Sequence, residues 1–261
     1  CILILDEERK MRVTQKDKIQ LGQISKGVYD KLIKACYDLS TRTFNKQVYE
    51  QQIFTHIQQS KASVLNESLN ENDALHFSGV PKNIIEEERY LKSQLMYYEQ
   101  LVSIDQTNMD DINSLANLRI SYRKFIADLE KKYSKYHQLK YKKNVKYALQ
   151  IQETLTENKV LCSYYLSSDA SMIYIASLDK NNLIINEVFA GDQLLNDITK
   201  FRNFIHYRLS KGYNKLSNHL YRLLIPSQKF IKNKSIVFFP DGQLNTIPFE
   251  ALSYKRTKKT Q

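Results

Sequence analysis

The sequence predicts an α+β protein, with a long helical region in front and a shorter α/β region behind it. The chain has 261 residues with only six glycines and no tryptophan, and all-β proteins usually need more turn glycines. Apolar residues recur at helical spacing up to about residue 156. From about Lys159, short runs rich in β-branched and aromatic residues replace that spacing. We therefore expect two domains, residues 1–156 and 157–261.

The helical region divides into four predicted segments. The first runs over about residues 16–43, and the second begins after Asn45, a candidate N-cap, and continues to about Leu69. The third follows the break at Ser78–Pro81, because proline suits a first helical turn. The fourth is one long helix from about Asp110 to Tyr141. Paired helices of this size are typical of an α-solenoid or a helical hairpin.

The α/β region begins with three predicted strands joined by polar turns, over Val160–Leu166, Met172–Leu178 and Leu183–Val188. Three such strands in succession predict a β-meander. Two helices are expected next, over about Gln193–Leu209 and Tyr213–Leu224.

The segment SIVFFPDGQLNTIPFEAL, residues 235–252, combines a buried strand with a rigid turn. Its apolar run is too short for a helix and rich in β-branched and aromatic side chains. Pro240 has no N–H to donate and so ends the strand, and Asp241-Gly242 supplies the turn. A buried strand that delivers a stiff turn at its carboxyl end is a common way for α/β sheets to build a site.

Six residues of this segment are therefore candidate site residues: Pro240, Asp241, Gly242, Pro248, Phe249 and Glu250. As functional groups, the two acids could orient backbone beside a substrate groove. As structural groups, Asp241 would bond the amides of its own turn and Glu250 would cap or pair locally. We favour the structural interpretation.

The formal net charge of +11 raises the possibility of an anionic partner. A candidate basic patch consists of Lys131, Lys132, Lys135, Lys140, Lys142, Lys143 and Lys146, and KRTKK follows near the C-terminus. One interpretation is phosphate contact, with the interleaved tyrosines as stacking surfaces. We favour the other, a solvated helix face, because base-edge recognition prefers arginine and the patch has none. Nucleic acid is accordingly not the expected partner.

The cysteines and histidines give little reason to expect catalysis. Cys162 lies inside a predicted strand and Cys36 on an apolar helix face, so we interpret both as buried hydrophobes. His206 and His219 are interpreted as packing or surface residues. Three widely spaced cysteines argue against disulfides and zinc, so we expect a reducing, cytoplasmic compartment, no metal and no cofactor. No apolar run approaches the ~20 residues of a membrane span.

Five segments together resemble a known family. They are QQSKASVLNESL (58–69), GVPKNIIEEERYLKSQL (79–95), VLCSYYLSSDASMIYIASLDKNNL (160–183), LYRLLIP (220–226) and IVFFPDGQLNTIPFEAL (236–252). They occur in the order found in TPR–CHAT proteins, in which tetratricopeptide helices precede a caspase-like CHAT domain. The resemblance covers roughly residues 45–254. It implies a TPR-like helical region followed by the first part of a caspase-like α/β domain.

The resemblance also implies an activity and its limit. TPR–CHAT proteins resemble clan CD cysteine peptidases, whose His–Cys dyad lies downstream of the PDG…PFEAL signature. Only Ser253–Gln261 follow here, without His or Cys, so the dyad is expected beyond Gln261 and this chain, read as a fragment, is expected to be inactive. The full-length relative would be a cysteine peptidase or a signalling scaffold.

Two alternatives come from other classes of protein. One is a protein-interaction module whose helical groove holds a peptide or a partner helix. The other, which we favour less, is nucleic-acid binding through the lysines. A sheet that ends at the strand near residue 239 would also leave an exposed edge, so self-association is a further expectation.

Overall fold

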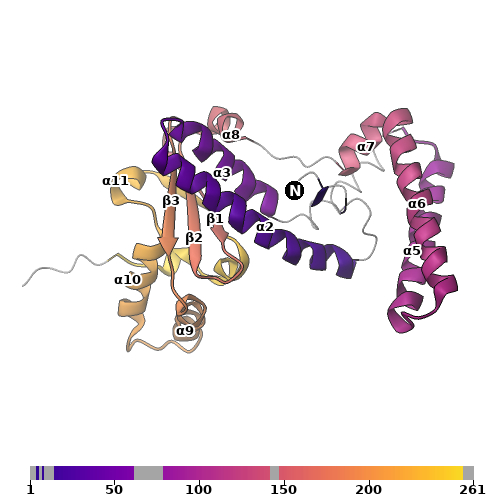
Figure 1. Cartoon of the computed structure of the whole chain (residues 1–261). Helices are drawn as coiled ribbons and strands as arrows, with labels where there is room; N and C mark the ends of the chain where they lie inside the picture. The colour runs from indigo at the N-terminus through magenta and orange to yellow at the C-terminus, as the bar shows by residue number, and fades with distance from the viewer. Residues whose placement is uncertain (1–3, 6–7, 9–14, 62–78, 142–146, 255–261) are drawn as a thin grey trace, which may run out of the picture. The chain divides into compact units, whose positions relative to one another are not determined.

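A computed structural model shows an α+β protein with helices and a four-stranded mixed sheet (Figure 1). It describes residues 4–5, 8, 15–61, 79–141 and 147–254. The chain forms two compact units, residues 1–28 with 62–144 and residues 29–61 with 145–261. Residues 29–61 thus belong to the unit that contains the sheet. The predicted domain boundary at residue 157 instead placed them with the other helices.

The sheet contains the predicted meander and the predicted last strand. Its strands are β1 (Lys159–Leu166), β2 (Met172–Leu178), β3 (Leu183–Phe189) and β4 (Ser235–Phe239), in the order β3-β2-β1-β4. The meander strands pair antiparallel, and β4 pairs parallel with β1, with Cys162 opposite Phe238. The positions of these four strands are confirmed to within one residue at each end. The prediction that the last strand is buried is wrong, because β4 lies at the end of the sheet order and Val237 and Phe239 are 41% and 47% exposed.

Helices cover both faces of this sheet, which explains why β1 and β2 are buried along nearly their whole length. Successive side chains of a strand point to opposite faces. Cys162 and Tyr164 of β1 pack in the core with residues of α9 (Leu194–His206) and α10 (Tyr213–Leu224). On the other face, the Tyr165 hydroxyl donates to Asp30 of α2 (Gln15–Arg42) at 2.7 Å.

Helices α2 and α3 (Lys46–Ser60) lie across the sheet in Figure 1. Ile53, Phe54 and Ile57 of α3 are fully buried, as their spacing predicts. Val48, an apolar residue near the start of the same helix, is exposed instead. Asn45 occupies the N-cap position of α3, but its side chain makes no capping hydrogen bond. The expected continuation of this helix to Leu69 lies outside the described residues.

The connection from β3 to β4 runs through α9, α10 and the short α11 (Gln228–Ile231). Helix α10 has the predicted bounds, whereas α9 ends at His206, three residues earlier than predicted. Gly212 precedes α10 with φ of 91°, a left-handed conformation that disfavours other residues. A Cβ there would also lie 3.2 Å from the Phe204 ring. The tight turn between the two helices therefore needs this glycine.

The other unit is built on a helical hairpin of α5 (Lys82–Ile104) and α6 (Met109–Lys132). Leu95 of α5 and Leu115, Tyr122 and Ile126 of α6 form its buried core. The predicted single helix to Tyr141 is wrong, because the chain leaves helical geometry at Tyr133 and restarts as α7 (Ser134–Tyr141). The remaining short helix, α8 (Ala148–Thr154), belongs to the unit that holds the sheet.

Candidate functional site

The turn after β4 lies where the parallel strands β1 and β4 end. After Pro240 the chain forms two short 3₁₀ turns, η1 (Gly242–Thr246) and η2 (Phe249–Ala251). The Asp241 carboxylate accepts a hydrogen bond from the backbone N–H of Leu166, at 3.0 Å, and does not cap η1. Asp241 thus joins the end of β4 to the end of β1.

The other candidate residues of this turn lie against the core or on the surface. Gly242 has a positive φ of 53°. The Phe249 ring stacks on Phe238 with centroids 4.4 Å apart and lies 5.5 Å from the Tyr164 ring. Glu250 is exposed in the first turn of η2. This geometry is what a packed, structural turn requires.

A half-buried lysine, Lys61, reaches the same end of the sheet from the end of α3. The Lys61 ammonium donates to the Ser163 hydroxyl at 2.8 Å and to the backbone carbonyl of Phe239 at 2.6 Å. The side-chain amide of Gln58 donates to the same hydroxyl at 2.9 Å. We call Lys61, Gln58, Ser163 and Asp241 the strand-end cluster. No local pattern in the sequence joins these residues, which lie up to 183 positions apart.

Burial dominates the electrostatics of this cluster. It lowers the pKa of Lys61 to about 8, while the negative charge of Asp241 acts in the opposite direction. Part of the Lys61 population is therefore neutral at slightly alkaline pH, and a neutral amine can act as a base or nucleophile. Ser163, however, is fully buried and accepts two hydrogen bonds, which suits a connector between α3 and β1 rather than a nucleophile.

Neither cysteine that the structure describes is activated. Cys162 is fully buried, and burial raises its pKa to about 12, partly offset by its contact with Ser177. Burial also raises the pKa of Cys36. A nucleophilic cysteine needs the opposite shift, toward the thiolate. His206 and His219 are both exposed, and His219 lies 3.7 Å from Asp197.

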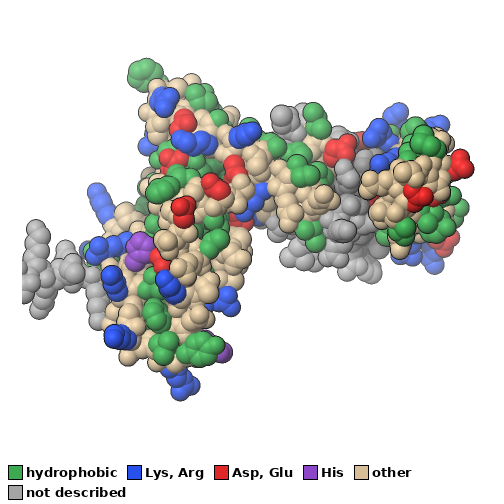
Figure 2. Space-filling view, turned by 60° about the horizontal axis from the view of Figure 1, so that its bottom comes forward, with side chains coloured by type: hydrophobic (Ala, Val, Ile, Leu, Met, Phe, Trp, Pro, Cys, Tyr) green, Lys and Arg blue, Asp and Glu red, His purple; other side chains and the backbone are tan. Residues whose placement is uncertain are grey.

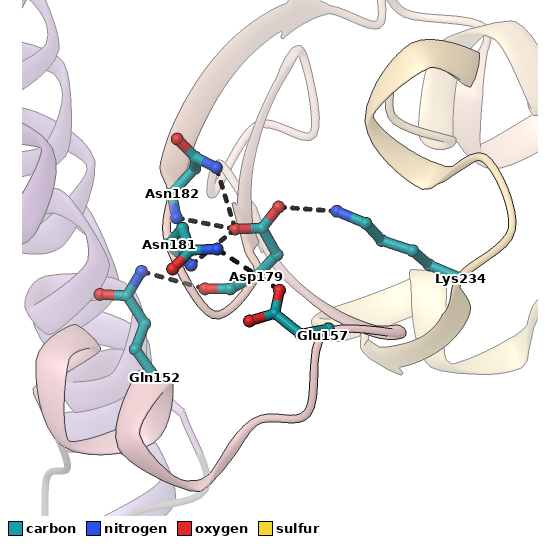
Figure 3. Close-up of polar contacts among 6 residues, drawn as sticks. All are labelled: Gln152, Glu157, Asp179, Asn181, Asn182 and Lys234. Carbon is teal, nitrogen blue, oxygen red and sulfur yellow. Dashed lines mark hydrogen bonds and ion pairs between the residues drawn. The ribbon is translucent and has the colours of Figure 1, made fainter.

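A second polar network fixes the start of β4 (Figure 3). Asp179, in the β2–β3 turn, accepts from the backbone N–H groups of Asn181 and Asn182 at 2.9 and 2.7 Å. Its second carboxylate oxygen lies 2.8 Å from the Lys234 ammonium, one residue before β4. Gln152 of α8 donates to the Asp179 backbone carbonyl at 3.0 Å. The sequence predicted a polar turn between these two strands, but it did not predict the distant partner Lys234.

The candidate basic patch is only partly within the described residues. Lys131, Lys132 and Lys135 are exposed at the α6–α7 junction. The side chain of Lys140 and the residues Lys142, Lys143 and Lys146 lie outside the description. On the face shown in Figure 2, described lysine and arginine side chains are scattered among acidic and apolar ones.

Tyr136, one of the tyrosines between these lysines, is not available for stacking. It is 1% exposed, and its hydroxyl donates to the Glu88 carboxylate at 2.8 Å. Glu88 also pairs with Lys92 at 3.3 Å and is buried, although it belongs to a run of three glutamates, residues 86–88, that would be expected on a solvated helix face. Glu86 and Glu87 are exposed.

A small open hollow lies on the opposite side of the sheet from α3. Its volume is about 240 Å³. The lining includes Ile175, Ile184 and Val188 of the sheet and Arg222, Leu223 and Phe230 of the α10–α11 segment. Arg222 is the one basic side chain of this lining, and Glu187 is its one acidic side chain. We regard this hollow as a weaker candidate for a functional site than the strand-end cluster.

Comparison with protein-family models, curated proteins and solved structures gave no match. Within the described residues, no group of three or more His, Cys, Asp or Glu side chains is arranged to hold a metal ion. No described helix is long and apolar enough to cross a membrane.

Proposed function

We propose that this chain is a fragment of a TPR–CHAT-type protein and that its own role is to bind a protein partner. The motif order and the succession of meander, two helices and parallel strand support the family. The full-length protein would then be a cysteine peptidase or a signalling scaffold. The helical hairpin is where we place the binding surface of this chain.

The observation that carries the proposal is an apolar stripe on α5. Tyr90, Tyr97 and Ile104 are 63%, 55% and 74% exposed, and they lie seven residues apart. Seven residues are close to two helical turns, so the three side chains share one side of α5. Leu95 is buried against α6 on another side of the same helix. Helix α5 therefore presents an apolar surface in addition to the one that its own hairpin uses.

The spacing of the stripe indicates the kind of partner. Apolar residues repeated every seven positions suit the apolar face of another helix, which meets such a stripe at matching intervals. Tyrosine is also favoured at interfaces, because its ring buries a large apolar area while its hydroxyl finds a polar partner. We therefore propose an amphipathic helix of a partner protein as the occupant.

The chemistry of the described thiols also favours binding over catalysis. Both are buried, and the pKa of each is raised. The strand-end cluster joins its own polar groups to one another, and its serine is fully buried. These groups stabilise the sheet unit and leave the stripe on α5 as the feature that needs a partner.

Photo-crosslinking tests the proposal. A photoreactive phenylalanine analogue replaces Tyr97 in one sample and Arg123, exposed on α6, in the control sample. In extracts of the source cells, we expect position 97 to give one identified crosslinked protein. Unlabelled wild-type chain should compete, and the variant Tyr90→Ser/Tyr97→Ser/Ile104→Ser should not. Equal crosslinking at position 123, or competition by the triple variant, would overturn the proposal.

A further inference from the structure

The turn between α9 and α10 is strongly basic. Over residues 191–234 the chain has nine lysine and arginine residues and two aspartates, so this stretch supplies +7 of the formal net charge of +11. Four of these cations lie in or beside the turn and are exposed: Arg202, Arg208, Lys211 and Lys215. Among the described residues, no acidic side chain forms an ion pair with any of the four.

Exposed apolar side chains lie among these cations. Ile205, Tyr207 and Leu209 are 38%, 64% and 49% exposed. The Tyr207 ring meets the His206 ring edge-on, with centroids 4.7 Å apart. The lower left of Figure 2, where α9 and α10 lie, accordingly shows blue side chains beside green ones. We call residues 202–215 the basic tip.

The backbone of the turn is fixed by hydrogen bonds. The N–H of Leu209 donates to the Phe204 carbonyl at 2.8 Å, and the N–H of Arg208 donates to the Ile205 carbonyl at 3.2 Å. This pair of bonds is the Schellman motif that closes many helix ends. Arg208 has a φ of 53°, the left-handed position that such a motif usually gives to glycine. The turn thus holds a cation where stability alone would favour glycine.

We propose that the basic tip docks on the surface of an anionic membrane. Anionic headgroups attract clustered lysine and arginine side chains. Apolar side chains beside such a cluster bury in the boundary between headgroups and acyl chains, and this is the place of Tyr207 and Leu209. Tyrosine suits that depth because its ring is apolar and its hydroxyl is polar. The long basic side chains keep their charged ends at the headgroups while their stems lie against apolar groups.

Two features favour a membrane over other acidic partners. Proteins that bind single-stranded nucleic acid stack bases on aromatic rings, whereas two of the three exposed apolar residues here, Ile205 and Leu209, are aliphatic. The turn also lies at the lower end of the sheet unit in Figure 1, beyond the strands. A soft lipid surface accepts such a point directly, whereas a protein partner needs a complementary depression.

Vesicle sedimentation with the full chain tests the proposal. We expect wild type to pellet with vesicles of equal parts phosphatidylcholine and phosphatidylserine and to stay in solution with pure phosphatidylcholine. High salt should release it, because salt screens exposed charges. Two double variants, Tyr207→Ser/Leu209→Ser and Arg208→Gln/Lys211→Gln, should each bind about tenfold more weakly.

Two further variants separate binding from charge in general and from folding. Lys131→Gln/Lys132→Gln removes the same charge from exposed lysines of α6 and should bind like wild type. Arg208→Gly places glycine at the left-handed position, so it should unfold at the same temperature as wild type or higher and yet bind about fivefold more weakly. A variant that bound less only because it misfolded would unfold at a lower temperature.

A tryptophan reporter shows whether the tip enters the lipid. The chain has no tryptophan, so Leu209→Trp carries a single indole. On the anionic vesicles we expect its emission to shift to shorter wavelength and to be quenched when the phosphatidylcholine is brominated. Ile184→Trp, at a position of β3 that is 38% exposed, is the control and should not respond.

Three results would overturn the proposal. They are a wild-type chain that does not pellet with anionic vesicles, equal binding by Arg208→Gln/Lys211→Gln and the α6 control, or an indole at position 209 that does not respond. Tighter binding to a labelled single-stranded oligonucleotide, retained by Tyr207→Ser/Leu209→Ser, would also overturn it and assign the cations to nucleic acid. None of these results bears on the helix partner of α5, which belongs to the other unit.

Discussion

Lys61 shows how a single side chain can join a helix to a sheet. It follows α3, yet its ammonium bonds to the middle of β1 through Ser163 and to the last residue of β4 through the Phe239 carbonyl. Lysine is rarely buried unless it is paired. The position of Asp241, whose charge favours the protonated amine, shows why the burial is tolerated.

The free energy of unfolding should carry the signature of this buried amine. Its pKa is about 8 in the folded protein against 10.5 ordinarily, so the unfolded chain holds more protons between these values. Stability from this group therefore rises with pH, by about 2 kcal/mol between pH 8 and 10. Urea unfolding at several pH values should show this rise in wild type relative to Lys61→Met. If the free energy of unfolding varied with pH in the same way for both proteins, the lowered pKa of Lys61 would be contradicted.

Cys162 should be almost inert in the folded protein. The reagent DTNB reacts with thiolates, and a pKa of about 12 leaves very few of them at pH 8. In a Cys1→Ser/Cys36→Ser background, we expect labelling only as fast as the protein opens, and complete labelling in urea. Rapid stoichiometric labelling under native conditions would show that the thiol is accessible and activated.

The sequence predicted the burial of Cys162 and could not predict the role of Lys61. The cysteine lies within an apolar run of strand-forming residues, so its local pattern is sufficient. Lys61 follows the polar stretch QQS at the end of a helix and resembles any surface lysine. Its partners Ser163 and Phe239 come from elements more than 100 residues away, and no local pattern specifies such contacts.

At the scale of elements, the Asp179–Lys234 pair sets where β4 begins. Both side chains are largely buried, and the pair links the β2–β3 turn to the segment that leads into β4. Burial raises the pKa of Asp179, but hydrogen bonds from Lys234 and from the Asn181 and Asn182 amides outweigh it, and the net pKa is lowered. A lowered carboxyl pKa contributes stability above the unfolded value, and this is lost as pH falls through the folded value.

Removing the lysine of this pair should destabilise the sheet unit. Lys234→Met leaves the buried Asp179 carboxylate without its cation, and we expect a loss of about 3 kcal/mol in urea unfolding at pH 7. The control Lys180→Met removes an exposed lysine of the same turn, 3.6 Å from Glu157, and should cost under about 1 kcal/mol. Equal losses for the two variants would show that the buried pair has no special role.

The break between α6 and α7 depends on a different polar contact. Tyr136 of α7 donates to the buried Glu88 of α5, so Tyr136→Phe removes one partner of a buried carboxylate. We expect the hairpin unit to lose about 1–3 kcal/mol and amides of α7 to exchange faster. Tyr133→Phe, at the helix break, is the control. Unchanged exchange in α7 would contradict this account of how the helix is held.

Elements were predictable where a local signal was strong. Strands β1 and β2 are short buried runs, β3 is a short run that begins with Leu-Ile-Ile, and polar turns bound all three. The bounds of α10 follow from Gly212 and Pro226. The break at Tyr133 was missed because apolar spacing continues across it without glycine or proline. The spacing of Tyr136 is equally compatible with one continuous helix. Its hydrogen bond to Glu88, which the sequence does not reveal, belongs to the broken helix that the structure shows.

At the scale of the whole molecule, the division into units follows distant contacts rather than composition. Residues 29–61 are helical like the hairpin but belong with the sheet. Asp30 accepts from Tyr165, and Gln58 and Lys61 donate to Ser163. A domain boundary placed where predicted helices give way to predicted strands takes no account of such contacts, because the sequence shows only where local structure changes.

We propose that the described residues bind a partner and do not hydrolyse peptide bonds. The most direct test incubates the purified chain with fluorescein-labelled casein, beside a Cys36→Ala/Cys162→Ala variant, over a range of pH. We expect the same background release of fluorescein-labelled peptides for both proteins. Hydrolysis by wild type that the double variant lacks would contradict it, because an activated thiol would then exist where the structure shows buried cysteines with raised pKa.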